Sequence, residues 1–178
     1  MKKIINLKII GLAVFCLLLI GVEANAQRRT KKRTPQPKAT TLAVNKNAAD
    51  IKAGAIRVGE QIKILTQFVY VLGGIRKDIE AIDAAAKTGK ATRGSVQQNE
   101  TTKKGVIASI GNVRAGLQKL ESDFKSNPAL QFYSIPLLAV NELANTAEQQ
   151  ANNNQFDQAG RTLVQAVAQL TDVMLSMR

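Results

Sequence analysis

The sequence predicts an all-α protein, an antiparallel four-helix bundle with a long first helix. Apolar residues recur at spacings of three and four in three segments of the chain, and another segment has a smaller apolar side, which is the pattern of helices that bury one face. Short stretches rich in Gly, Asn, Ser and Pro separate these segments, and helices joined by short loops pack most simply as antiparallel neighbours. We expect a single domain at 42–178 with helices at roughly 46–87, 95–126, 135–151 and 155–177.

The first predicted helix carries a heptad-like apolar stripe, Ile51, Ala55, Val58, Ile62, Leu65, Val69, Leu72, Ile75, Ile79, Ile82 and Ala86. The phase slips beside Gly73 and Gly74, which predicts a kink or a short break. Apolar coverage between 62 and 72 is wider than one stripe, so a β-strand is the local alternative. Because a helix that is apolar on several sides must be covered, we expect a partner face made of Ile64, Phe68, Tyr70 and Val71.

The second predicted helix opens with Ser95 and Gln98, which have the spacing of a capping box. Its apolar stripe is Val106, Ile110, Val113, Leu117, Leu120 and Phe124. Pro128 favours the start of a new turn, whereas Pro136 would be costly inside a helix, so we expect the third helix to begin near Ile135. Its predicted buried side is Leu138, Leu143, Ala144, Ala147 and Ala151.

The fourth predicted helix starts after Asn154, which can act as its N-cap. Its stripe is Phe156, Gly160, Leu163, Val167, Leu170, Met174 and Met177. Around the preceding turn, Leu143, Ala147, Phe156, Ala159, Leu163 and Ala166 have the spacing of packing residues in a tetratricopeptide-type hairpin, so residues 143–166 resemble a single such repeat. A lone repeat has no neighbours to bury its faces, and we interpret the segment as ordinary helix-hairpin packing. A non-bundle helical array is the alternative architecture.

The N-terminus has the pattern of a targeting signal. A basic start, Met1-Lys2-Lys3, precedes fourteen uncharged residues from Ile9 to Val22 and the small residues of Ala24-Asn25-Ala26. This order is typical of a secretory signal peptide. We expect cleavage before Gln27 and a periplasmic or secreted protein, with an uncleaved membrane anchor as the alternative.

Two stretches are strongly basic. Residues 28–38 hold six basic residues, two prolines and no acid, which predicts a disordered arm at 27–41. Residues 87–104 carry five basic residues against Glu100. Either stretch is a candidate for binding an anionic lipid or a cell-wall polymer, and the plain alternative is a solvated tether and ordinary surface charge. The candidate anion-binding residues are Arg28, Arg29, Lys31, Lys32, Arg33, Lys38, Lys87, Lys90, Arg93, Lys103 and Lys104.

Composition excludes several kinds of chemistry. With no His in the chain, imidazole metal sites and His-based catalytic triads cannot form within one chain. Asp78, Glu80 and Asp83 are interpreted as a solvated, salt-bridged helix face, and no phosphate-binding loop of the Walker type is present. We therefore expect a protein that is not an enzyme, binds no metal or cofactor, and binds an envelope protein or its own copy through apolar helix faces. Nucleic acid is not an expected partner, because the basic arm has no aromatic residues for stacking.

Overall fold

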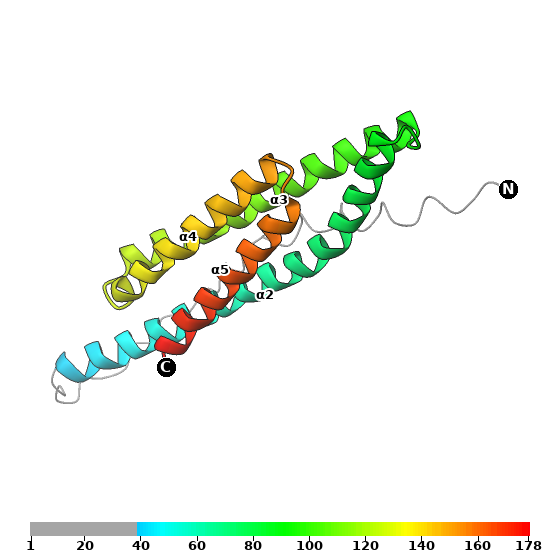
Figure 1. Ribbon diagram of the computed structural model, residues 1–178. Coiled ribbons are helices and arrows are strands. Elements are labelled where there is room, and N and C mark those ends of the chain that lie inside the picture. The colour runs from blue at the N-terminus through cyan, green and yellow to red at the C-terminus, as the bar shows by residue number, and fades with distance from the viewer. Residues whose placement is uncertain (1–38) are drawn as a thin grey trace, which may run out of the picture. The chain divides into compact units, whose positions relative to one another are not determined.

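The computed structural model describes the backbone of residues 39–178 and the side chains from Lys46 onward. This part of the chain forms four helices and no strand (Figure 1): α2 (Ala39–Lys87), α3 (Arg93–Ser126), α4 (Gln131–Asn152) and α5 (Phe156–Ser176). The predicted all-α, four-helix fold is confirmed. The predicted signal peptide at 1–26 and residues 27–38 of the predicted arm lie outside the described residues.

Each helix packs against two others, so the four form a closed ring of neighbours. α2 contacts α3 and α5, and α4 contacts the same two helices. Short turns reverse the chain between consecutive helices (Figure 1). Among these four helices, the diagonal pairs α2–α4 and α3–α5 lie farther apart and are not direct neighbours. The predicted helical bundle is therefore present.

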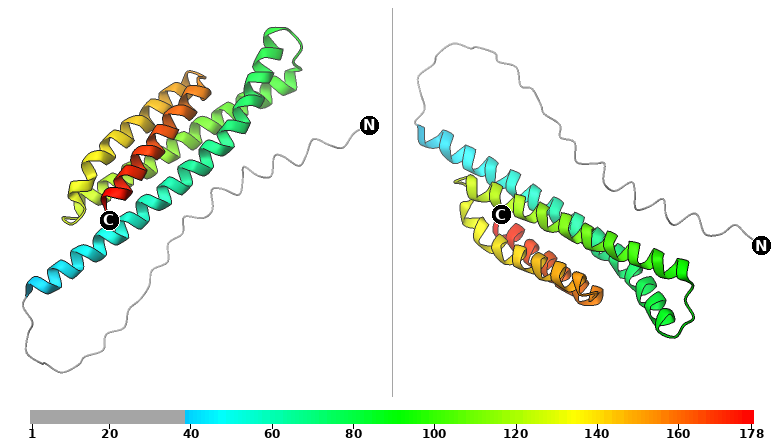
Figure 2. Two further views of the ribbon diagram at one scale, coloured as in Figure 1. Left: turned by 60° about the horizontal axis from the view of Figure 1, so that its bottom comes forward. Right: turned by 90° about the horizontal axis from the view of Figure 1, so that it is seen from above.

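α2 is the longest helix and runs beyond both α4 and α5. Its 49 residues span about 70 Å at the rise of an α-helix. Arg76 of α2 forms an ion pair with Asp157, in the first turn of α5, at 2.8 Å. Beyond this contact, the end of α2 and the start of α3 extend past α4 and α5 and pack only against each other (Figure 2). We call residues 77–103 the hairpin, and residues 54–76 with 104–177 the four-helix part.

The region of α2 for which a strand was the alternative is helical throughout. Gly73 and Gly74 also lie inside the unbroken helix, so no break occurs there. Figure 2 shows that α2 changes direction along its last third, as a kink requires. The helix begins at Ala39 rather than near residue 46, so the last three residues of the predicted arm, 39–41, are helical.

The core follows the predicted stripes closely in α2, α3 and α5. Every seventh residue of α2 is buried from Val58 through Leu65 and Leu72 to Ile79, which is a heptad repeat. The buried residues of α3 include all six that its stripe predicts, and α5 buries Phe156, Leu163, Leu170 and the following Met177. These side chains meet in the middle of the ring.

The predicted start of the third helix is wrong. α4 begins at Gln131, four residues before Ile135, and holds Pro136 in its second turn. Proline there removes one hydrogen bond to the carbonyl of Phe132, and both residues are exposed, so water can hydrate that carbonyl. The resulting helical phase buries Leu137 and leaves Leu138 45 % exposed, which also overturns the prediction that Leu138 is buried.

The helix caps differ from the predicted ones in two places. Thr92 caps α3 by accepting a hydrogen bond from the Ser95 N–H at 3.2 Å, so Ser95 is not the cap. Asn154 is not an N-cap either, because it has a φ of 59° and follows the end of α4. The N–H of Gln155 donates to the carbonyl of Gln150 at 2.8 Å, and together these features form a Schellman motif.

The turn after α2 uses the same motif with a different residue. Gly89 has a φ of 70°, and the N–H of Lys90 donates to the carbonyl of Ala85 at 2.8 Å. Glycine adopts this left-handed conformation without steric cost. Both α2 and α4 therefore end in a Schellman motif.

Candidate functional site

The outer side of α4 bears an apolar stripe that no described residue covers. Phe132 is 77 % exposed, Ile135 66 % and Leu138 45 %. They recur every three residues, so they share a face, and that face lies opposite the buried side chains of Leu137 and Val140. We call Phe132, Ile135 and Leu138 the α4 stripe. A helix that is apolar on both sides is typical of a surface that meets a partner.

The turn between α3 and α4 fixes the start of this stripe. The side-chain oxygen of Asn127 accepts the N–H of Ala129 at 3.0 Å, and its carbonyl accepts the N–H of Leu130 at 2.9 Å. Pro128 lies inside this turn, where its fixed φ is favourable. Next to the turn, the ring of Phe132 contacts Tyr133 edge to face, with centroids 5.7 Å apart. A shallow open depression here is lined by Lys125, Pro128, Gln131, Phe132, Ser134 and Ile135.

The layer made by α4 and α5 carries few charges. α4 has two charged side chains in 22 residues and α5 has three in 21, whereas α3 has nine in 34. Glu148 pairs with Arg114 at 2.7 Å, and Asp157 pairs with Arg76. Depletion of charge together with exposed aromatic and aliphatic residues is the composition of an interface core. Sequence reasoning missed this surface because it placed Phe132 outside the helix.

The predicted partner face on α2 is only partly available. Tyr70 is 85 % exposed and Val71 48 %. Ile64 and Phe68 are half-buried, and Phe68 packs against the core. The four residues therefore do not form one open surface, although the segment is not wholly buried within the chain.

The predicted basic region at 87–104 divides into exposed and buried residues. Lys87, Lys90, Arg93 and Lys104 are exposed, and none of them forms an ion pair with another described residue. We call Lys87, Lys90 and Arg93, which flank the turn of the hairpin, the basic tip. The fifth residue, Lys103, is buried. The tip lies at one end of α2 and Ala39 at the other, while the candidate cations of the arm lie outside the described residues.

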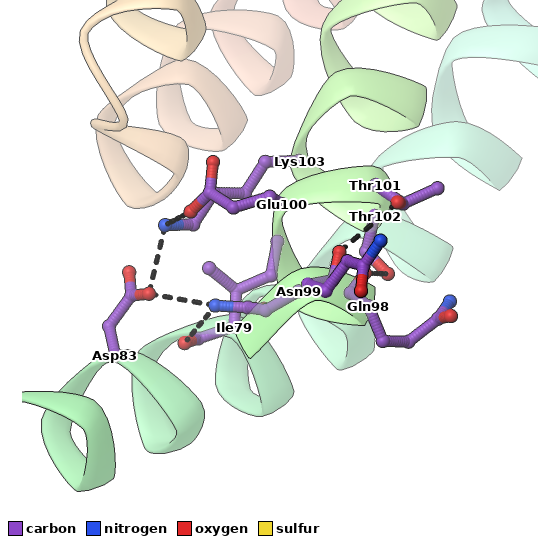
Figure 3. Close-up of polar contacts among 9 residues, drawn as sticks. Ile79, Asp83, Gln98, Asn99, Glu100, Thr101, Thr102 and Lys103 are labelled. Carbon is purple, nitrogen blue, oxygen red and sulfur yellow. Dashed lines mark hydrogen bonds and ion pairs between the residues drawn. The ribbon is translucent and has the colours of Figure 1, made fainter. Parts of the chain in front are cut away.

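Lys103 belongs to a polar cluster between the two helices of the hairpin (Figure 3). Its Nζ lies 2.8 Å from Asp83 Oδ1 and 2.9 Å from Glu100 Oε1. The side-chain amide of the buried Asn99 donates to the same Asp83 oxygen at 2.7 Å and to the carbonyl of Ile79 at 3.4 Å. The prediction of a solvated helix face is wrong for Asp83, which is partly buried and joins α2 to α3.

The charge of Lys103 is stabilised by this cluster. Burial on its own would lower the pKa of Lys103, but the hydrogen bonds and the negative charges of Asp83 and Glu100 outweigh it, and the pKa is raised above its usual value. Lys103 is buried, and its ammonium group already pairs with Asp83 and Glu100 within the hairpin. Lys103 is therefore not available to bind an external anion.

Within residues 39–178, no helix is long and apolar enough to cross a membrane. The acidic side chains of this part also form no group of three or more that could hold a metal ion.

Comparison with protein families, with curated proteins and with solved structures finds nothing that matches this chain. The α4 stripe and the basic tip are therefore the features of the described residues that point to a function.

Proposed function

We propose that this chain is an exported helical interaction module of the cell envelope, which needs no cofactor and binds another protein or a second copy of itself through an apolar helix face. The observation that carries the proposal is the α4 stripe. Fully burying one large apolar side chain contributes about 1.5–3 kcal/mol. Because the three side chains are already partly buried, with exposed fractions of 77 %, 66 % and 45 %, covering them contributes about 3–6 kcal/mol before the cost of association is subtracted.

Export is supported by the N-terminal sequence. The basic start, the uncharged run of fourteen residues and the small residues before Gln27 match a cleavable signal peptide. The mature chain would have no cysteine, since Cys16 lies in the removed segment. We further propose that residues 27–38 form a disordered basic arm, because they combine high charge with two prolines and few apolar residues.

The test uses a photo-crosslinking amino acid placed at Phe132 in the producing cell. The same amino acid at Tyr70 samples the α2 face, and at Thr101, an exposed polar position of α3, it serves as a control. We expect protein adducts from position 132 and none from position 101. An absence of adducts from both Phe132 and Tyr70 would overturn the proposal. The N-terminus of the purified protein, read by mass spectrometry, tests cleavage before Gln27.

A second candidate function is favoured by the basic tip. Lys87, Lys90 and Arg93 are exposed, and no acidic residue occurs between Asp83 and Glu100. Such a tip would attract an anionic envelope ligand, a lipid head group or a cell-wall polymer, by releasing counterions. Binding to vesicles of anionic phospholipid should then fall steeply with salt and weaken when all three residues are changed to Gln, with the six basic residues of the arm left in place. A Lys46, Lys52 and Lys63 triple change to Gln removes the same charge elsewhere on α2, and equal losses for both triple variants would reject the tip as the site.

A further inference from the structure

We propose that the α4 stripe is covered by the α4 stripe of a second copy of this chain, with the two α4 helices antiparallel about a two-fold axis near Ile135. This proposal rests on the proposed function and names the partner. It predicts an isologous dimer, in which the same surface of each copy forms the interface.

The shape of the stripe suits an antiparallel pairing. Phe132, Ile135 and Leu138 are evenly spaced along one helix face. When a second helix runs in the opposite direction about Ile135, the large ring of Phe132 meets the partner's Leu138 and each Ile135 meets its own copy. A parallel pairing would instead place the two Phe132 rings against each other and leave the smaller Leu138 side chains to meet at the other end.

The charges at the two ends of the stripe select the same orientation. Lys125 lines the depression beside Phe132 and its side chain is 53 % exposed, although it also pairs with Glu121. Glu142 follows Leu138 by one turn, is exposed, and forms no ion pair with another described residue. In an antiparallel dimer, the Lys125 of each copy faces the Glu142 of the other, which gives two equivalent ion pairs. A parallel dimer would instead bring the two lysines together and the two glutamates together.

The other charged side chain of α4 does not oppose the contact. Apart from Glu142, the only charged side chain of α4 is Glu148, which is paired with Arg114 of the same copy. Two copies can therefore approach along α4 without bringing unpaired like charges together. This arrangement fits a second copy better than a strongly charged partner, which would find little to pair with on this face.

The first test measures solution mass over a dilution series by light scattering, with the full coding sequence expressed and the processed form purified. We expect a dimer that persists in high salt, because the stripe is apolar. Ile135→Asp should weaken dimerisation by at least about thirty-fold. Ile56→Asp makes the same change at an exposed isoleucine of α2 and should leave the dimer unchanged. A monomer at all concentrations, or equal effects of both variants, would overturn the proposal.

The second test checks the orientation by charge reversal. Lys125→Glu and Glu142→Lys should each weaken the dimer by about five- to thirty-fold, because each change disturbs two symmetric pairs. The double variant should dimerise at least about fivefold more tightly than Lys125→Glu alone, because both variants carry the same loss of the Glu121–Lys125 pair within the chain. Lys104→Glu, an exposed lysine of the hairpin, is the control. Failure of the double variant to recover would reject the antiparallel arrangement.

The crosslinking experiment separates the two proposals. An adduct at Phe132 with twice the mass of the chain supports the second copy. An adduct with a different protein overturns the proposed dimer and supports the proposal of an interaction module. A protein that is monomeric and gives no adduct at Phe132 or Tyr70 overturns both.

Discussion

The four-helix part and the hairpin bury different kinds of side chain. In the four-helix part the enclosed residues are almost all apolar, for example Val58, Leu117 and Leu163. In the hairpin the buried residues are Ile79, Asn99 and Lys103, two of which are polar. The same pair of helices, α2 and α3, thus changes its core composition where α4 and α5 end.

The difference follows from the number of helices that surround the stripe. Four helices enclose a stripe from all sides, and an unpartnered polar group there would cost several kcal/mol. Two helices leave their flanks in water, so a buried polar side chain can keep its partners at the edge. Asn99 and Lys103 of α3 both contact Asp83 of α2, and they can do so in only one register of the two helices. We expect the four-helix part to supply stability and the polar cluster to fix the register of the hairpin.

The largest expected effect is the removal of a central side chain from the four-helix part. Phe124 is fully buried, and Phe124→Ala should lower the free energy of unfolding by about 3–5 kcal/mol through lost burial and a cavity. Ile79→Ala in the hairpin should cost less, about 2 kcal/mol, because its surroundings can relax into water. Urea unfolding followed by circular dichroism measures both. Equal costs would contradict the comparison.

Removing a charge from the polar cluster should give the second-largest loss of stability. Asp83→Asn keeps the shape of the side chain but removes the charge that faces the buried Lys103. We expect a loss of about 1–2 kcal/mol, reduced from that of a fully buried pair because Asp83 is partly exposed. Asp78→Asn is the matched control on the same helix, exposed and outside the cluster. Hydrogen exchange should be faster in residues 77–103 of the Asp83 variant alone.

The contribution of this cluster depends on pH in a defined direction. Because the folded-state pKa of Lys103 lies above its usual value of 10.5, the stabilisation is complete below pH 10.5 and is lost as the pH rises through the folded-state pKa. The stability difference between wild type and Asp83→Asn should therefore be constant near neutral pH and shrink in strong alkali. A difference that stays unchanged in strong alkali would mean that the effect does not depend on the charge of Lys103.

The turns allow a smaller test. Gly89→Ala forces a side chain into the left-handed conformation at the end of the hairpin and should cost about 1 kcal/mol. Asn154→Gly, at the same position of the other Schellman motif, should be neutral or stabilise slightly. Thermal unfolding of the two variants measures this contrast. A loss from Asn154→Gly would show that its side chain makes a contact that the motif does not require.

The smallest expected effect has the opposite sign. Gly73 and Gly74 are exposed inside α2, and a methyl group at either position would meet no atom within 4 Å. Replacing each by Ala should stabilise the protein by about 0.5–1 kcal/mol, because alanine loses less backbone entropy in a helix. An unchanged or lower melting temperature would mean that the change of direction in α2 depends on glycine.

The sequence predicts most of the fold because alternating apolar spacings map directly onto helix faces. It does not predict the buried residues of the hairpin, where Lys103 and Asn99 are polar. A search for apolar periodicity overlooks polar side chains that are buried because they have hydrogen-bonding partners. Lys103 lies three residues before Val106 and Asn99 four residues before Lys103, and this continuation of the α3 spacing could have identified both.

The α4 stripe was missed for a different reason. The cost of Pro136 inside a helix places the predicted start of the third helix near Ile135, with a short turn or helical fragment before it, and the adjacent leucines 137 and 138 leave the helical phase ambiguous. The run Leu137, Val140, Ala144, Ala147 and Ala151 has spacings of 3, 4, 3 and 4 and fits the buried side. Extending that run backwards places Phe132 and Ile135 on the outer face. The polar cluster and the dimer contact, by contrast, involve residues from two helices and need coordinates.

The positions of the two tyrosines give the molecule a built-in optical reporter. The chain has no tryptophan, so its intrinsic fluorescence comes from Tyr70 and Tyr133. Tyr133 is half-buried against the ring of Phe132, whereas Tyr70 is open to solvent on α2. Quenching of tyrosine fluorescence by a soluble agent therefore distinguishes the α2 side from the α4 side of the molecule without any added label. Protection that appears on concentrating the protein, and is absent from a Tyr133→Phe variant, locates the event on α4.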